Sequence, residues 1–144
     1  MNSMGESSDF REGVVVVVRR ADRFLMIRRA EGLLAAGWWC FVGGGIDAGE
    51  TQEEAVVREF REEVGGSVRP VKWLWEYWRP DRKLRLHWWL AAIDGEDLRA
   101  NPSEVQEFGW FQIAEIDALP QVLESNREFL SKFGGILTEQ EIPP

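Results

Sequence analysis

Runs of apolar residues alternate with short polar segments along this chain, and their spacing predicts strands, helices and turns. The residues from Val14 to Val18 form a continuous aliphatic run, which is typical of a strand buried on both faces. Two later segments alternate apolar and polar positions around a turn at residues 79–82, and this pattern predicts an antiparallel hairpin. The predicted strands cover residues 13–19, 23–28, 38–41, 71–78, 83–92 and 107–111.

Two segments carry apolar residues at helical spacing, every three or four positions. The first covers residues 51–64, where Thr51 can cap the start and Glu54 can complete a capping box. Gly65 follows directly and suits the left-handed conformation in which many helices end. The second predicted helix covers residues 121–133.

Three consecutive glycines, residues 43–45, predict a break in regular structure between the third strand and the first helix. Hairpins interleaved with helices are typical of a mixed sheet that has helices on both faces. We therefore expect an α/β protein with a single domain over residues 10–134. Flexible tails are expected at residues 1–9 and 135–144.

Composition excludes several classes of function. The chain has 144 residues and a formal net charge of −8, so a basic face for a nucleic acid polymer is not expected. Cys40 and His87 are the only cysteine and histidine, which argues against a zinc site and a disulfide framework. No apolar run is long enough for a membrane span, and the first nine residues lack the apolar segment of a signal peptide, so a cytoplasmic location is expected.

Three glutamates gather on one side of the first predicted helix. At about 100° per residue, Glu59, Glu62 and Glu63 fall within roughly a third of the helix circumference, whereas Arg58 and Arg61 fall on another face. Glu59 and Glu63 are four residues apart, and such a like-charge pair destabilises a helix by about 0.2–0.5 kcal/mol. A hard divalent cation would remove this repulsion. The pattern alone leaves two interpretations open, a metal site and a solvated acidic face.

The same segment resembles the Nudix box. Gly44 is followed after five residues by Glu50, and after seven more by residues 58–65, which read Arg-Glu-Phe-Arg-Glu-Glu-Val-Gly. Seven identities and one apolar position match, while Gly66 stands at the final apolar position and Val42 stands where many relatives have proline. The resemblance implies the α/β/α sandwich of Nudix hydrolases around a mixed sheet, and hydrolysis of a phosphoanhydride bond with Mg²⁺ or Mn²⁺.

The resemblance also implies roles for individual residues. The metal ligands would be Glu59, Glu62 and Glu63, together with a backbone carbonyl of Gly43 or Gly44. Glu59 or Glu63 would take the proton from the attacking water. Arg58 and Glu50 would form a salt bridge that orients the helix against the glycine loop. A further acidic ligand is expected after the hairpin, with Glu104 as the first candidate and Glu107 as the second.

The substrate implied by the box is a nucleoside diphosphate linked to a group X. We expect a nucleoside triphosphate, including an oxidised one such as 8-oxo-dGTP, cleaved to the monophosphate and pyrophosphate. The candidate substrate contacts are stacking of a base on Trp75, Tyr77 and Trp89 and a phosphate contact from Arg28. The aromatic residues could instead cover the sheet under a helix. Trp73, Trp75 and Tyr77 are expected on one face of their strand.

Several alternatives stay open at this point. ADP-ribose and nucleotide sugars are competing small-molecule substrates. An RNA 5′-end pyrophosphohydrolase shares the box but is disfavoured by the acidic charge. A Nudix-like binding module without catalysis is disfavoured by the intact glutamates. The resemblance leaves room for a homodimer, and no membrane partner is expected.

Overall fold

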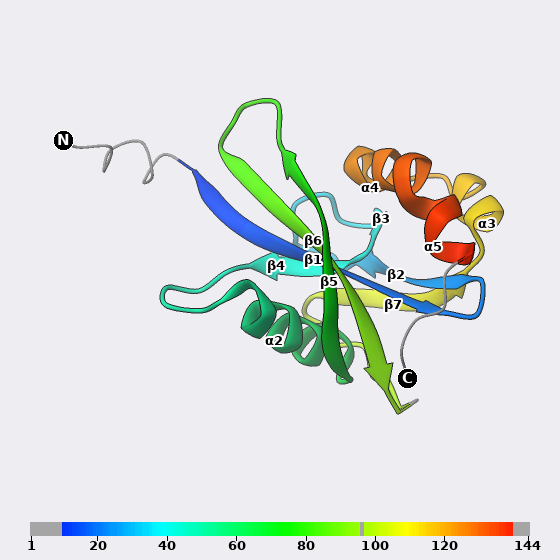
Figure 1. Ribbon diagram of the computed structural model, residues 1–144, viewed down its shortest axis with the longest axis horizontal. Helices are drawn as coiled ribbons and strands as arrows, with labels where there is room; N and C mark the ends of the chain where they lie inside the picture. Colours follow the sequence, from blue (N-terminus) through cyan, green and yellow to red (C-terminus); the bar gives the residue numbers. More distant parts are fainter. Residues whose placement is uncertain (1–9, 96, 140–144) are drawn as a thin grey trace.

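A computed structural model describes residues 10–95 and 97–139; the tail expected at residues 1–9 and the end of the chain from residue 140 lie outside the described residues. The strands are β1 (Arg11–Arg20), β2 (Arg23–Arg29), β3 (Trp39–Cys40), β4 (Val42–Gly45), β5 (Ser67–Trp78), β6 (Leu84–Asp94) and β7 (Val105–Phe111) (Figure 1). The helices are α2 (Gln52–Val64), α3 (Ile113–Asp117), α4 (Glu124–Phe129), the π-helix η1 (Leu130–Gly134) and α5 (Gly135–Glu139). Within these residues no helix is both long and apolar enough to cross a lipid bilayer.

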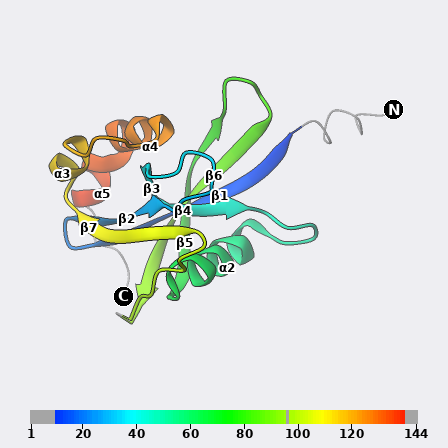
Figure 2. The same ribbon diagram turned by 180° about the vertical axis from the view of Figure 1, so that it is seen from behind.

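The strands form one mixed sheet with helices on both faces, which confirms the predicted α/β/α architecture. The order across the sheet is β3-β2-β1-β6-β5, with β4 paired to β1 and β7 paired to β2. Strand β1 runs parallel to β6 and antiparallel to β2 and β4. Figures 1 and 2 show α2 on one side of the sheet and α3, α4 and α5 on the other.

Strand β1 lies at the centre and is buried on both faces, as its aliphatic run predicts. Val14, Val16 and Val18 pack in the core beneath α2. Val15 and Val17 pack in a second core with residues of the C-terminal helices. A strand covered on both sides needs apolar residues at every position, and this need explains the absence of alternation in the run.

The predicted hairpin forms from β5 and β6, but two irregularities in β5 change which side chains share a face. The register shifts between Pro70 and Lys72 and again between Trp73 and Trp75. Across the sheet Trp73 is paired with Trp89, whereas Trp75 is paired with Trp88. The prediction that Trp73 and Trp75 share a face is therefore wrong, because the extra residue of a bulge reverses the alternation.

The C-terminal segment differs from the single predicted helix over residues 121–133. Val122 instead forms a parallel bridge with Trp39, so the chain there is extended and helix α4 begins only at Glu124. Helix α4 continues into the π-helix η1 and then into α5. Leu137 in α5 is only 3% exposed and packs in the second core, so residues 135–139 do not form the loose tail that was expected.

Candidate active site

Helix α2 begins and ends where the sequence predicts, because both of its ends are capped. The Thr51 side chain accepts a hydrogen bond from the Glu54 backbone N–H at 3.0 Å, and the Glu54 carboxylate accepts one from the Thr51 N–H at 2.9 Å. Gly65 ends the helix with a φ of 69°, in the left-handed region that favours glycine. The rigid helix buries two of its glutamates, Glu59 and Glu63, against the sheet.

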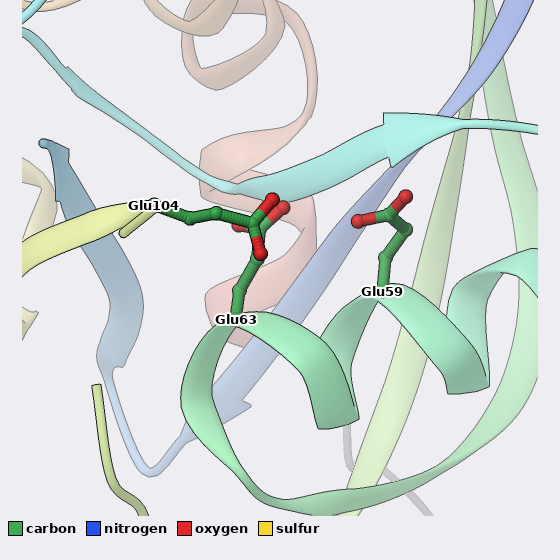
Figure 3. A group of neighbouring side chains, drawn as sticks. All are labelled: Glu59, Glu63 and Glu104. Atoms are coloured by element: carbon green, nitrogen blue, oxygen red, sulfur yellow. The ribbon is translucent and has the colours of Figure 1, made fainter. Parts of the chain in front are cut away.

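Three carboxylates converge between α2 and the strands. One oxygen from each of Glu59, Glu63 and Glu104 lies within 4.8 Å of the other two. Figure 3 shows Glu59 and Glu63 rising from α2 beneath the cyan strand β4, with Glu104 reaching them from the chain just before β7. Glu59 and Glu63 are 7% and 5% exposed, so the group sits largely away from bulk water. We refer to these three residues as the carboxylate group.

Burial makes the carboxylate group electrostatically unfavourable when no cation is present. Burial and the neighbouring Glu59 and Glu104 carboxylates raise the pKa of Glu63. Burial raises the pKa of Glu59 as well, although the Arg58 guanidinium opposes this. Glu63 Oε1 is buried without a hydrogen-bond partner among the residues that the structure describes. An unpaired buried oxygen beside two further carboxylates is a donor set that suits a hard divalent cation.

The glycines before α2 form strand β4 and do not break the sheet as predicted. Gly43 and Gly44 are paired with Val15 and Val14 of β1. A Cβ at Gly43 would lie 2.5 Å from the Val14 carbonyl oxygen, and a Cβ at Gly44 would collide with the Glu59 carboxylate. Glycine is thus needed here for close approach, and it lets the backbone of β4 lie directly over the carboxylate group.

Arg58 links the helix to the loop that follows β4. Its Nε and Nη2 atoms donate to the two oxygens of Glu50 at 2.7 and 2.8 Å, and Nη2 also donates to the Gly45 carbonyl at 2.7 Å. This bidentate pairing lowers the pKa of Glu50 to about 2. The geometry matches the salt bridge implied by the resemblance and pins the helix to the end of β4.

Arg58 also reaches the glutamates, although the helical wheel places it on another face of the helix. Its Nη1 donates to Glu59 Oε2 at 3.0 Å and to Glu62 Oε1 at 3.2 Å. A helical wheel places Cα atoms only, whereas a long arginine side chain can bend back across its own helix. The Glu62 side chain is 48% exposed and lies at the edge, outside the carboxylate group.

The structure separates the two candidates after the hairpin. Glu104 joins the carboxylate group, and the amide of Asn101 donates to its Oε2 at 3.1 Å. Glu107 instead accepts from Arg28 at 3.2 Å, and Arg28 also donates to the Gly37 carbonyl. Arg28 is thus held by the protein's own oxygens.

Two adjoining cavities open beside β4. Of the residues that the sequence suggested as substrate contacts, Tyr77 lines the smaller cavity. The smaller cavity, of about 410 Å³, lies between β4, the hairpin and the start of α4. Trp75 packs against Trp88 and Phe129 of the second core, which are stacked on each other. The larger cavity, of about 980 Å³, lies between β1, the loop after β4 and the start of β6. Trp89 donates to Gln52 on the α2 side of the sheet, and neither Trp75 nor Trp89 lines either of these two cavities.

Sequence reasoning did not single out Phe41 and Asn126, which line the smaller cavity. Asn126 is 4% exposed, and its Oδ1 accepts a hydrogen bond from the Phe41 N–H at 2.9 Å. The available signal was a polar residue at an apolar position of the second predicted helix. Arg29 lines both cavities, so it lies where they meet.

Comparison with known proteins agrees with the fold and the box. A family profile for the NUDIX domain matches residues 9–133. The NAD-capped RNA hydrolase NudC of Chromobacterium violaceum is 36% identical over 108 residues, and that of Stutzerimonas stutzeri is 30% identical over 107. Each alignment covers 74% of this chain but 38% of the relative, so the chain spans about two fifths of these curated proteins.

Solved structures share the fold at lower sequence identity. A NUDIX hydrolase from Nitrosomonas europaea superposes with a TM-score of 0.82 at 18% identity, covering 92% of this chain and 74% of that one. A MutT protein from Methanosarcina mazei Go1 gives 0.76 at 22% identity, covering 89% and 95%. The chain therefore belongs to the Nudix hydrolase family, as the residues around the carboxylate group indicate.

Proposed function

We propose that this protein hydrolyses a phosphoanhydride bond in a nucleoside diphosphate linked to a group X, with Mg²⁺ or Mn²⁺ bound at the carboxylate group. The observation that carries the proposal is the convergence of Glu59, Glu63 and Glu104, with a buried Glu63 oxygen that no described residue satisfies. Divalent cations in such sites neutralise phosphate charge and acidify a bound water. A binding module without chemistry would have no need of this costly arrangement.

The residues around the carboxylate group divide the work of such a site. Glu59, Glu63 and Glu104 would hold the cation, with the Gly43 or Gly44 carbonyl and the more exposed Glu62 as further oxygen donors. Glu59 or Glu63 would accept the proton of the attacking water, since a buried carboxylate with a raised pKa is a competent base. Arg58 acts as a positioning residue, because its bonds to Glu50 and Gly45 fix the helix relative to β4.

The smaller cavity is the proposed site of the nucleoside. Its volume lies within the ~300–1,000 Å³ range of small-molecule sites. Tyr77 offers aromatic surface for a base, and Arg29 and Arg79 offer positive charge for phosphates. A nucleoside triphosphate, including 8-oxo-dGTP, is the first candidate substrate, with the monophosphate and pyrophosphate as products.

A second candidate has a sugar or another nucleoside as X. The larger cavity beside Arg29 provides room for such a group, which a triphosphate would not fill. Among the similar proteins, the NAD-capped RNA hydrolases and an ADP-ribose pyrophosphatase from Streptococcus suis are named for substrates of this kind. The acidic charge of this chain favours a small nucleotide over an RNA polymer.

The test is a substrate panel assayed with Mg²⁺ and with EDTA. It should contain the four dNTPs, 8-oxo-dGTP, ATP, ADP-ribose, NAD and GDP-mannose, with products identified by chromatography. We expect hydrolysis only with the metal and a nucleoside monophosphate among the products. A tenfold lead in kcat/KM, about 1.4 kcal/mol of transition-state binding, decides between the two candidates. Absence of metal-dependent hydrolysis across the panel would overturn the proposal.

A further inference from the structure

The larger cavity is lined by three acidic side chains, of which Asp47 and Glu50 are paired with Arg58 and Glu12 is not. Glu12 lines this cavity from β1 and keeps 36% of its side chain exposed. The rest of the lining mixes the apolar side chains of Phe10, Ile46, Leu84 and Leu86 with charged and polar ones, among them Arg11, Arg29 and Gln52. The larger and smaller cavities share Arg29 and Gly44 in their linings, so they adjoin at these two residues.

Glu12 is held in a fixed orientation by donors on its Oε2 atom. Arg85 donates to Oε2 through Nε at 3.0 Å and Nη2 at 2.7 Å. His87 Nε2 lies 2.9 Å from the same oxygen. Burial raises the pKa of Glu12, but the bonds from His87 and Arg85 outweigh this effect and lower it. Arg85 and His87 both bind Oε2, and none of these three contacts uses Oε1.

The tautomer of His87 follows from its other neighbour. Trp73 Nε1 lies 3.3 Å from His87 Nδ1, and an indole N–H can only donate. Nδ1 must therefore accept, and the proton of the neutral ring is on Nε2, where it is donated to Glu12. His87 is 5% exposed and lies between its two partners. The chain Trp73–His87–Glu12 makes the carboxylate an acceptor on the cavity wall that cannot easily turn away.

We propose that the larger cavity binds the polyhydroxyl part of X, a sugar or the ribose of a second nucleoside, and that Glu12 accepts hydrogen bonds from its hydroxyl groups. The inference rests on the proposed hydrolase function and names the substrate class of the same site. Carboxylate oxygens accept well from hydroxyl groups. The apolar side chains of Phe10, Leu84 and Leu86 suit the faces of a sugar or base. His87 and Trp73 are positioning residues, since they act through Glu12.

The experiment compares ADP-ribose with ATP, which share the adenosine and differ in X. For each protein the quantity measured is the ratio of kcat/KM for ADP-ribose to that for ATP, so a change in the folded fraction cancels. Glu12→Gln should lower the ratio at least tenfold relative to wild type. Glu12→Asp, which keeps the charge but withdraws the oxygens, should lower it as well. On an ADP alkyl ester whose X has no hydroxyl groups, the ratio to ATP should not fall.

The matched control is Asp94→Asn, which removes one negative charge from the exposed far end of β6. It should leave both activities unchanged. A fall of less than tenfold in the kcat/KM ratio of Glu12→Gln would overturn the inference. Hydrolysis of ATP but not ADP-ribose by the wild type would also overturn it, but would leave the hydrolase proposal standing. If neither nucleotide is hydrolysed with Mg²⁺, the proposed function itself fails.

Discussion

Replacement of Glu63 by glutamine should stabilise the metal-free protein and abolish its stabilisation by metal. Glutamine keeps the size of the side chain and removes its charge. In the metal-free wild type, Glu63 is buried beside Glu59 and Glu104 with an oxygen that lacks a partner among the described residues. The amide carries no charge to desolvate and repels neither neighbour.

The sign of the metal-free effect follows from the raised pKa of Glu63. A carboxyl whose folded-state pKa is raised stabilises the fold fully below its unfolded value near 4.5, and this contribution is lost as the pH rises through the folded pKa. Each pH unit in that window costs up to about 1.4 kcal/mol. Glu63 can share one proton with Glu59, and this sharing reduces the total destabilisation of the metal-free wild type. We therefore expect Glu63→Gln to be more stable than wild type by roughly 2 kcal/mol at pH 8, or about 6 °C in Tm.

Metal should stabilise the wild type and leave the stability of the variant nearly unchanged. With a Kd of about 1 mM, 10 mM Mg²⁺ stabilises the wild type by RT ln 11, about 1.4 kcal/mol or about 4 °C. The variant lacks one of the three carboxylates that face the ion, so its shift should be within about 1 °C of zero. The variant loses the Mg²⁺-induced rise in Tm and is more stable than wild type in EDTA, and both effects come from the charge of the Glu63 side chain.

The assay is a set of thermal melts at pH 8 with EDTA or 10 mM Mg²⁺. It includes wild type, Glu63→Gln and the charge-matched control Asp94→Asn, which should follow wild type in both buffers. Lowering the pH to 5 in EDTA should remove most of the difference between variant and wild type. A variant no more stable than wild type in EDTA at pH 8, or one that keeps the full Mg²⁺ shift, would refute the reasoning.

Three further predictions concern neighbouring residues. Arg58→Lys should lower kcat about 10–100-fold while Tm falls by only a few degrees, because lysine cannot bridge both Glu50 oxygens; unchanged kcat would contradict the positioning role. Gly44→Ala should lose the Mg²⁺ shift in thermal melts, since its Cβ collides with the Glu59 carboxylate; a retained shift would contradict the close approach. In ¹⁵N NMR spectra at pH 8, the single histidine should have its proton on Nε2, and Trp73→Phe should keep it there because the Glu12 carboxylate still accepts from Nε2; Nδ1 protonation in wild type would refute the hydrogen-bonded chain Trp73–His87–Glu12.

Local signals were enough to predict helix α2, whereas the pairing of Arg58 with Glu50 was implied by the resemblance to the Nudix box. A capping box at Thr51 and a glycine at residue 65 act within one or two turns, so their effect is readable in sequence. The family motif then placed the helix in the mixed sheet. Glu104 was one of two acidic candidates after the hairpin, and only the folded chain brings it to Glu63.

Long-range contacts explain what the sequence did not predict. The glycines of β4 pair with β1, and there the neighbouring backbone and Glu59 leave no room for a side chain. This crowding, which requires glycine, exists only in the folded chain. The bulge near Trp73 depends on hydrogen bonding across the hairpin and turns that side chain toward His87. Val122 is held extended by its bridge to Trp39, which overrides the helical spacing of its segment.

The most direct test of the central claim is turnover by wild type and Glu63→Gln, measured on the best substrate of the panel with 10 mM Mg²⁺ at pH 8. We expect wild-type hydrolysis that EDTA abolishes, and a kcat for the variant lower by roughly 10²–10⁴-fold with its fold intact. Near-normal turnover by Glu63→Gln in Mg²⁺, or wild-type turnover that persists in EDTA, would contradict the assignment of the carboxylate group as the metal-dependent catalytic centre.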